Sequence, residues 1–365
     1  EMMQGYAEVD GLTKNTLYAV NLYDTSKPRK YDKPYNQVTF RTAGPSAMSI
    51  QVGLEDDLSA MLLDNDVDPE VPEGTEYYLP AGSSYRVTPF SLMKGFRLAG
   101  SRDGVKPVVV LEGSWSIAEG SYLSSLEFDN IEFRHEANNN YFMNTSKAYT
   151  IENVSFVNCD FISLRRGFWR HQSANAKYIM NLEMEGCRFE GCGWQTSAYG
   201  TFNLQSFDKD NGVSYDQVDR AIFRNCTFSN DNDGTNGYGW GNLFYAPYMD
   251  KPIELEYKNV TIYNYSRNQR LINIESAVGS KLVMQGILLA SPCGDLYAIG
   301  ANTTTTFSDN YTTADYALGG SKMNATDLEI TADKLFVDPV NGDLTIKDTS
   351  SPIVSSRAGD TRWLP

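Results

Sequence analysis

The chain has 365 residues, with 31 Lys and Arg against 46 Asp and Glu, which gives a formal net charge of −15. A surface of that charge repels nucleic-acid phosphates and anionic lipid, and no run of about 18 apolar residues is present, so the composition argues against nucleic-acid binding and against a membrane span. We expect no signal segment within this sequence, so the cellular location has to be inferred indirectly.

The first predicted elements are strands within residues 1–44. Apolar and polar residues alternate after Leu12, and a second strand pattern begins at Val38. The segment resembles the last strands of a fibronectin type III module, in which the spacing of Leu12 and Tyr18 fits the tyrosine corner. The resemblance covers about half of such a module, and it implies a spacer in an extracellular protein.

Residues 45–75 are predicted to form a linker and an N-terminal cap. A short helical patch spans 59–63, and an acidic, proline-containing stretch follows it. The first rung of a repeat structure needs a polar cover that blocks strand pairing at its open edge, and this segment suits that role.

An eight-residue phrase then recurs seven times, with apolar alternation on both sides of one Gly or Asn. That central position is occupied by Gly95, Asn130, Asn153, Gly186, Asn225, Asn259 and Gly286. Gly and Asn enter the left-handed region most readily, so each copy is expected to be a strand, a one-residue corner and a second strand. The corners are 23 to 39 residues apart, so each rung must stack on its neighbours to bury its inner face.

The predicted fold class is therefore all-β: residues 76–350 form a single parallel β-helix, preceded by a small β-sandwich-like fragment. The repeat resembles the right-handed parallel β-helices of the pectate-lyase-like superfamily over about residues 55–345. Residues 351–365 are predicted to close the solenoid, and this end resembles β-helix proteins from glycan-utilisation systems of gut Bacteroidetes. The resemblance implies a monomeric protein at the cell surface, outside the cell or in the periplasm, with a polysaccharide or other glycan as partner.

The repeat also accounts for residues that could otherwise suggest separate chemistry. Three acceptor sequons begin at predicted corner residues, so their asparagines are expected to have a structural role; they are Asn153, Asn225 and Asn259. Cys187 and Cys226 take the repeat position of Ile131, and Cys159 and Cys192 share another, so we expect buried thiols rather than disulfides or a zinc site.

In the pectate-lyase-like superfamily the cleft lies on the third strand of each rung and on the loop leading into it. The outward positions predicted on that strand are Trp169, His171, Asn203, Gln205, Asn273 and Glu275. The loops and strand starts beside them carry planar side chains, namely Arg165, Arg166, Arg170, Trp194, Tyr199, Tyr238, Trp240, Arg267 and Arg270. Guanidinium groups suit carboxylates and aromatic faces suit sugar rings, so this flank is the predicted glycan-binding site.

Three functions use these residues differently. The candidate catalytic groups are Arg165, Arg166, Arg170, His171 and Glu275, because in β-helix lyases an arginine or lysine removes the proton beside a uronate carboxylate that calcium neutralises. Weak candidates for calcium ligands are Asp208, Asp210, Asp231 and Asp233. The Asp, Asn and Gly residues around them are also typical of ordinary turns. Glycan binding without turnover is the leading hypothesis, a polysaccharide lyase is the alternative, and a glycoside hydrolase and a structural spacer follow.

Overall fold

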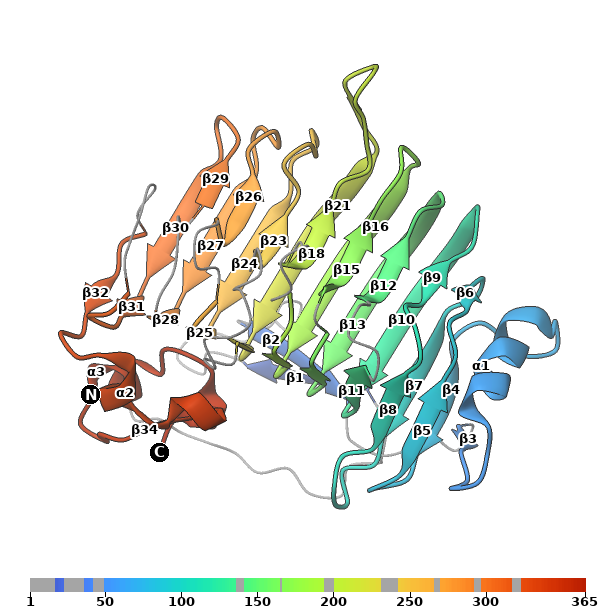
Figure 1. The fold of residues 1–365 in the computed structure, drawn as a ribbon, viewed down its shortest axis with the longest axis horizontal. Helices are drawn as coiled ribbons and strands as arrows, with labels where there is room; N and C mark the ends of the chain where they lie inside the picture. Colours follow the sequence, from blue (N-terminus) through green and yellow to red (C-terminus); the bar gives the residue numbers. More distant parts are fainter. Residues whose placement is uncertain are drawn as a thin grey trace, which may run out of the picture.

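The computed structural model describes residues 17–22, 36–41, 49–135, 141–164, 166–193, 200–230, 242–265, 270–291, 297–316 and 323–365. The three largest sheets are parallel and run side by side along the molecule, two of ten strands and one of six (Figure 1). We call them sheets 1, 2 and 3, in the order in which the chain meets them in each rung.

Sheet 1 contains β3 (Ile50–Gln51), β4 (Thr75–Leu79), β7 (Phe96–Gly100), β10 (Ser121–Asp129), β13 (Tyr149–Val157), β16 (Lys177–Glu185), β21 (Asp216–Arg224), β24 (Glu254–Lys258), β27 (Lys281–Gln285) and β30 (Thr304–Ser308). Sheet 2 contains β5 (Ser84–Val87), β8 (Val108–Leu111), β11 (Glu132–His135), β14 (Asp160–Ile162), β17 (Arg188–Glu190), β22 (Thr227–Ser229), β25 (Thr261–Tyr263), β28 (Leu288–Ala290), β31 (Tyr311–Thr312) and β32 (Thr326–Asp327). Sheet 3 contains β12 (Tyr141–Thr145), β15 (Gly167–His171), β18 (Gly200–Leu204), β23 (Phe244–Tyr245), β26 (Ile272–Ile274) and β29 (Tyr297–Ile299).

Six successive rungs, from the one that begins with β10 to the one that ends with β29, pass once through each sheet. The strands β10, β11 and β12 belong to one rung and β13, β14 and β15 to the next, and each strand pairs in parallel with its counterpart one rung away. Leu126 lies opposite Val154, and Phe128 lies opposite Phe156. The predicted all-β parallel β-helix is confirmed.

Most of the predicted corners between sheets 1 and 2 are confirmed. Asn130, Asn225 and Asn259 have φ of 57°, 49° and 53°, and Gly186 and Gly286 have φ of 65° and 63°. Each of the five residues follows a sheet 1 strand and precedes a sheet 2 strand. The left-handed residue turns the chain from one sheet to the next, as the repeat predicts.

Two of the predicted corners are wrong. Asn153 lies inside β13, and the corner of that rung is Asn158, with φ of 51°. Gly95 precedes β7, and the pairing of β7 with β10 places Gly100 beside Asn130 instead. The error is the same in both copies, because apolar residues keep alternating across a long strand and the pattern alone does not mark where it ends.

Aromatic side chains stack along the interior. Phe133, Phe161, Phe189 and Phe228 follow one another on sheet 2, with ring centroids 5.4, 4.8 and 4.8 Å apart and nearly parallel planes. All four side chains are fully buried. The register therefore aligns like residues between rungs, which gives the core its continuity.

The cysteines are buried free thiols where the structure describes them, as predicted. Cys159, however, stacks in one column with Cys187 and Cys226, and not with Cys192 as predicted. The hydrogen bonds between rungs show this, because the N–H of Arg188, which follows Cys187, donates to the carbonyl oxygen of Cys159, and the N–H of Thr227, which follows Cys226, donates to that of Cys187. Cys293 lies outside the described residues. Of the sequon residues, Asn153 is exposed on sheet 1, where its amide donates to the carbonyl oxygen of Ser124 at 3.2 Å.

The two ends of the solenoid are covered differently. Helix α1 (Leu58–Val67) lies across the first rung, as predicted, and places Leu58 and Leu62 in the main core. At the other end the chain packs as a second apolar cluster against the outer face of sheet 2, around Tyr263 and Leu288. This C-terminal unit comprises α2 (Ala332–Leu335), β33 (Phe336–Asp338), the 3₁₀ turn Pro339–Asn341, β34 (Asp343–Ile346), α3 (Pro352–Ser356) and the 3₁₀ turn Thr361–Trp363.

The remaining pairs are short. The strands β1 (Leu17–Leu22) and β2 (Asn36–Arg41) form an antiparallel pair in the region predicted to be fibronectin-like, whose Leu12 lies outside the described residues. The others are β6 (Ser91–Leu92) with β9 (Ser116–Ile117), β19 (Phe207–Asp208) with β20 (Val213–Ser214), and β33 with β34 in the C-terminal unit. No helix in the described part of the chain is both long and apolar enough to cross a membrane.

Candidate functional site

The register of sheet 3 decides which side chains face outward on the predicted binding strand. Trp169, Phe202, Phe244 and Ile272 are paired across β15, β18, β23 and β26, and all are buried in the core. The next column, one residue later on each strand, is Arg170, Asn203, Tyr245 and Asn273. Because successive residues of a strand point to opposite faces, this polar column lies on the outer face.

The predicted outward orientation of Trp169 and His171 is wrong. Both side chains are fully buried, so neither can contact a glycan or act on one at the surface. On β15 the outward residue is Arg170, between them. Four other residues were predicted to face outward and do lie in the outward phase of their strands, namely Asn203, Gln205, Asn273 and Glu275. Two of them are nevertheless almost fully buried, since Asn203 is 1% and Asn273 is 4% exposed.

The outer face of sheet 3 is built on these two buried amides. The Gln205 side-chain amide donates to Oδ1 of Asn203 at 2.6 Å. Two strands further along, on β26, Oδ1 of Asn273 accepts the backbone N–H of Glu275 at 3.2 Å. Arg270 donates to the Glu275 carboxylate at 3.1 Å. The asparagines thus orient the chain, and the groups that reach solvent are those of Gln205, Arg270 and Glu275.

An aromatic pair lies beside this polar row. Phe207 and Tyr248 stack with ring centroids 4.2 Å apart and planes 16° from parallel, and Tyr248 is 36% exposed. Tyr245 is half-buried on the outward column, and burial, followed by the nearby Tyr248 and Glu275, raises its pKa. The face therefore combines a flat apolar surface with hydrogen-bonding groups, and we call Gln205, Tyr245, Tyr248, Arg270 and Glu275 the sheet 3 face.

Arginines extend this face toward the N-terminal rungs. Arg170 is half-buried, and its guanidinium lies 5.5 Å from the centre of the Tyr141 ring, within range of a cation–π contact. Arg166, just before β15, is also half-buried. The other predicted site residues of the loops lie outside the described residues; they are Arg165, Trp194, Tyr199, Tyr238, Trp240 and Arg267.

Two of the four predicted calcium ligands, Asp208 and Asp210, lie in the described part of the chain, and there they are not grouped with other metal-ligand side chains. Asp208 accepts the backbone N–H groups of Asp210 and Asn211 at 2.9 and 3.2 Å, so it closes its own turn. Asp231 and Asp233 lie outside the described residues. Within the described ranges, no three His, Cys, Asp or Glu side chains are grouped as metal ligands.

A buried polar network behind sheet 3 was missed by the sequence analysis. His171 donates from Nδ1 to Asp216 at 2.6 Å, and its Nε2 accepts from the hydroxyl of Tyr149 at 2.5 Å and from Trp169 Nε1 at 3.2 Å. The other Asp216 oxygen accepts the backbone N–H of Ser206 at 2.5 Å. Burial lowers the pKa of His171, which agrees with the neutral tautomer that these bonds require.

Lys177 completes the network. Its amine donates to the Ser206 hydroxyl at 2.6 Å and to the carbonyl oxygens of Ser173 and Asn175 at 3.2 and 2.8 Å. Burial lowers the pKa of Lys177 to about 8, against the opposing effect of Asp216. Lys177 and Ser206 have no exposed surface, so we assign the network to holding the turns between sheets 3 and 1.

No protein-family model matches the chain, and a search of curated proteins finds no relative.

Proposed function

We propose that the sheet 3 face binds a polysaccharide that lies along the solenoid. The observation that carries this proposal is a row of solvent-reaching groups along successive strands of sheet 3. Gln205 directly follows β18, Tyr245 lies on β23, and the Arg270–Glu275 pair flanks β26. Adjacent strands are about 4.8 Å apart, so a polymer along the axis meets a new set of groups at every rung.

The aromatic pair supports a sugar ligand. Sugar rings bind by laying an apolar face against an aromatic ring while their hydroxyls bond nearby polar groups. Tyr248, held flat by Phe207, supplies the first contact, and the amide of Gln205 supplies the second. A plain solvated ladder would not need a stacked aromatic pair beside it.

The arginines favour a glycan that carries carboxylates. Arg270 pairs with Glu275 at 3.1 Å, and Arg166 and Arg170 are two further guanidinium groups on the same flank of a chain whose net charge is −15. A guanidinium binds a carboxylate through paired hydrogen bonds. A uronate-containing polysaccharide is therefore the proposed ligand class.

The likeness to pectate-lyase-like β-helices and to a fibronectin type III segment supports an extracellular or cell-surface location. Both likenesses are analogies at the level of the fold, so they favour a glycan partner without identifying it. The polysaccharide lyase alternative rests on Arg166 and Arg170, because an arginine serves as the base in β-helix lyases.

Retention on immobilised polysaccharides tests the proposal. Replacing Tyr248 and Gln205 together by Ala should abolish the slowed migration of the protein through gels that contain an acidic polysaccharide. Tyr122→Ala is the matched control. Tyr122 is also an exposed tyrosine, but it lies on β10 of sheet 1, whereas β23 belongs to sheet 3. Equal retention of the double variant and the control would disprove binding at the sheet 3 face.

The same preparations decide between binding and elimination. A lyase would generate unsaturated products with ultraviolet absorbance from uronate polymers, with or without added calcium, and Arg170→Ala would remove that signal. Retention without any absorbance change across the polymers that bind would leave glycan binding as the function.

A further inference from the structure

Within the described part of the chain, the N-terminal end of the solenoid has an unpaired strand edge. There, sheet 2 ends at β5, which has β8 on one side and no other described strand on the other. The amide of Val108 on β8 bonds the carbonyl of Ser83, and the amide of Glu112 bonds that of Val87. In a parallel ladder this alternation turns the backbone groups of Ser84 away from β8, toward the open side.

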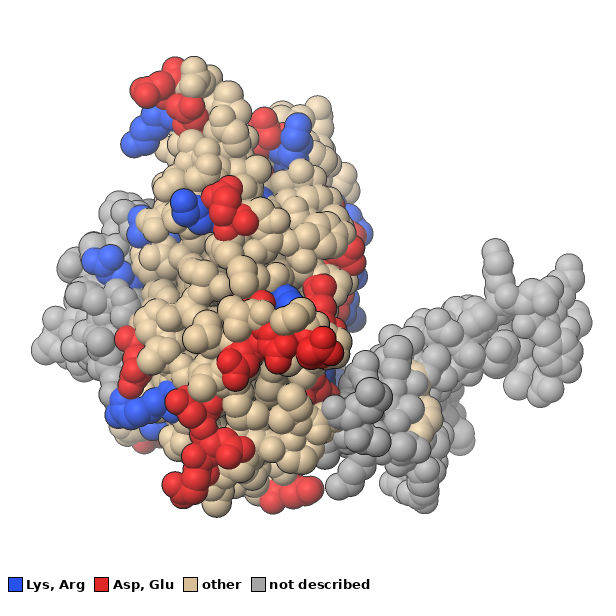
Figure 2. Space-filling view, turned by 90° about the vertical axis from the view of Figure 1, so that its right-hand side faces the viewer, with Lys and Arg blue, Asp and Glu red and all other residues tan. Residues whose placement is uncertain are grey.

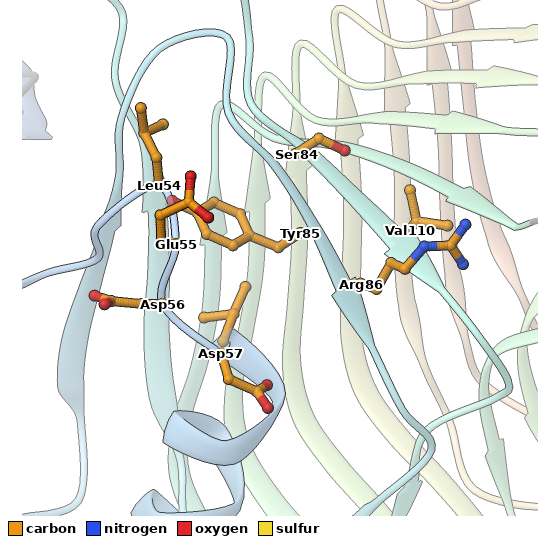
Figure 3. Close-up of a pocket in the computed structure, with 9 residues that line it drawn as sticks. Leu54, Glu55, Asp56, Asp57, Ser84, Tyr85, Arg86 and Val110 are labelled. Atoms are coloured by element: carbon orange, nitrogen blue, oxygen red, sulfur yellow. The ribbon is translucent and has the colours of Figure 1, made fainter.

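The cap covers only one end of this edge. Just past β5, the backbone N–H of Thr88 donates to the hydroxyl of Ser59 on α1 at 3.1 Å. Beside Ser84, a hollow of about 410 Å³ lies between the cap and β5 (Figure 3). The loop from Leu54 to Asp57 forms one wall of the hollow, and Tyr85 and Arg86 of β5 form the other.

The charge around the hollow is mostly negative, with Arg86 as the cation among the lining residues. Residues 49–85 include nine acidic residues and no Lys or Arg. Seven of the nine are exposed, namely Glu55, Asp56, Asp57, Asp64, Asp68, Glu70 and Glu73. Figure 2, which faces this end of the solenoid, shows acidic side chains gathered over the cap. The nearest cation on β5, Arg86, is paired with Glu112 at 3.3 Å.

Apolar groups are exposed on the same surface. Leu54, at the rim of the hollow, is 67% exposed, and Leu63 and Val67 on the outer side of α1 are 50% and 58% exposed. A cap that served only to keep solenoids apart would need the charges and not these side chains.

We infer that the β5 edge binds an extended basic peptide segment of a partner protein, which adds to sheet 2 as a further strand. The free backbone groups at Ser84 supply the main-chain hydrogen bonds of strand addition, Glu55 and its neighbours pair with Lys or Arg side chains of the peptide, and Leu54 packs on its apolar residues. This site is separate from the sheet 3 face, so either assignment can fail without the other.

Synthetic peptides test the inference on the full chain. An octapeptide of alternating Val and Lys should bind, as measured by calorimetry at low salt, while the matched Val and Glu peptide should not. N-methylation of alternate amides in the Val and Lys peptide keeps the charge but removes backbone donors, and it should weaken binding at least tenfold. Equal binding of the N-methylated peptide would mean ionic adsorption only and would overturn strand addition.

Variants of the chain locate the site. Glu55→Lys should weaken binding of the Val and Lys peptide at least tenfold, whereas Glu70→Lys makes the same charge change on the cap outside the hollow and should have a much smaller effect. Ser84→Pro removes an outward N–H at an edge position that tolerates proline, and it should also block binding. If Ser84→Pro fails to fold, the N-methylated peptide tests the same bond.

Two results would overturn the inference. Equal weakening by Glu55→Lys and Glu70→Lys would show that the peptide follows the overall charge of the cap. Dimers of the unliganded chain in sedimentation velocity that Glu55→Lys dissociates would show that a second copy occupies the edge.

Discussion

At the scale of single residues, the left-handed corners fix where each rung turns. Asn225 has φ of 49°, its amide donates to Glu185 at 2.6 Å, and its Oδ1 accepts from Thr361 at 3.4 Å. Two separate properties thus favour Asn at this corner, namely its tolerance of positive φ and its side-chain bonds.

Two substitutions separate these properties. Asn225→Gly and Asn225→Ala both lose the side-chain bonds, but only Ala has a Cβ that disfavours the left-handed conformation. Asn225→Ala should therefore lower the free energy of unfolding by about 1–2 kcal/mol more than Asn225→Gly does. Chemical denaturation measures the difference, and equal losses would mean that backbone strain does not set the corner.

The buried His171 predicts a pH dependence of stability. Burial lowers the pKa of His171 below its ordinary value of 6.5, with Asp216 opposing the shift and Lys177 adding to it. Below about pH 6.5 the unfolded chain therefore takes up a proton that the folded chain does not bind. The free energy of unfolding should fall as the pH drops, by at most about 1.4 kcal/mol per pH unit from this group.

A variant that cannot titrate isolates this effect. His171→Gln should be less stable than the parent chain at pH 7.5, because it disturbs the bonds to Asp216 and Tyr149. The gap between the two proteins should narrow as the pH is lowered from 7.5 to 5. A gap that stays constant over that range would show that His171 does not titrate differently in the two states.

At the scale of the strand, the sequence predicted the repeat better than it predicted the phase of each copy. Period-two alternation identifies a strand, but a shift of one residue exchanges its faces. On β15 both Trp169 and His171 carry polar atoms and suggested an outward face. Their partners Tyr149 and Asp216 lie 20 to 45 residues away, so spacing along the chain does not reveal that these atoms are satisfied inside.

The corner errors have a related cause. In β13 the polar Asn153 interrupts an apolar alternation just as a corner does, and only the pairing with β10 shows that the strand continues to Val157. The phase was correct for β18 and β26, where the residues inward of the site are plainly apolar, such as Leu204 and Ile274. The outward face of a strand could be predicted where apolar and polar residues separate cleanly, and not where the core itself is polar.

The phenylalanine column gives a prediction at this scale. Phe161 stacks between Phe133 and Phe189 and also contacts Phe168, with centroids 4.6 Å apart. Phe161→Ala leaves a cavity between rungs and should cost about 3–5 kcal/mol in the free energy of unfolding. Phe161→Leu keeps most of the buried area and should cost less than half as much, as denaturation of the two variants would show.

At the scale of the whole molecule, an open solenoid has to end its sheets without inviting further pairing. The last strand of sheet 1, β30, places Thr305 where the rung before has the buried Leu282. Its residues Thr304, Thr305 and Thr306 are all exposed, so a polar hydroxyl replaces an apolar side chain where no rung follows. The N-terminal end relies on α1 and acidic charge instead, and it leaves the edge of β5 open beside Ser84.

The C-terminal segment ties several rungs together from outside. Trp363 donates to the Thr227 hydroxyl at 2.7 Å, and Thr227 donates to Asp360 at 2.7 Å. The Asp360 amide donates to Thr261 at 2.9 Å, and Arg362 donates to the carbonyl oxygen of Gly186 at 2.5 Å. These contacts join β22 and β25 with the corner after β16, across sequence separations of 99 to 176 residues.

A chain that ends at Ser356 should therefore be less stable than the full chain. At about 1 kcal/mol per hydrogen bond, these four bonds and the one from Thr361 to Asn225 amount to a loss of at least about 5 kcal/mol in the free energy of unfolding. Proteolysis should then open the rungs of β22 and β25 before that of β10, because the removed segment contacts β22 and β25 directly. Lys334→Ala, at an exposed position of α2, is the control and should leave the cleavage pattern unchanged. Uniform cleavage along the truncated solenoid would instead show that its rungs unfold as one unit.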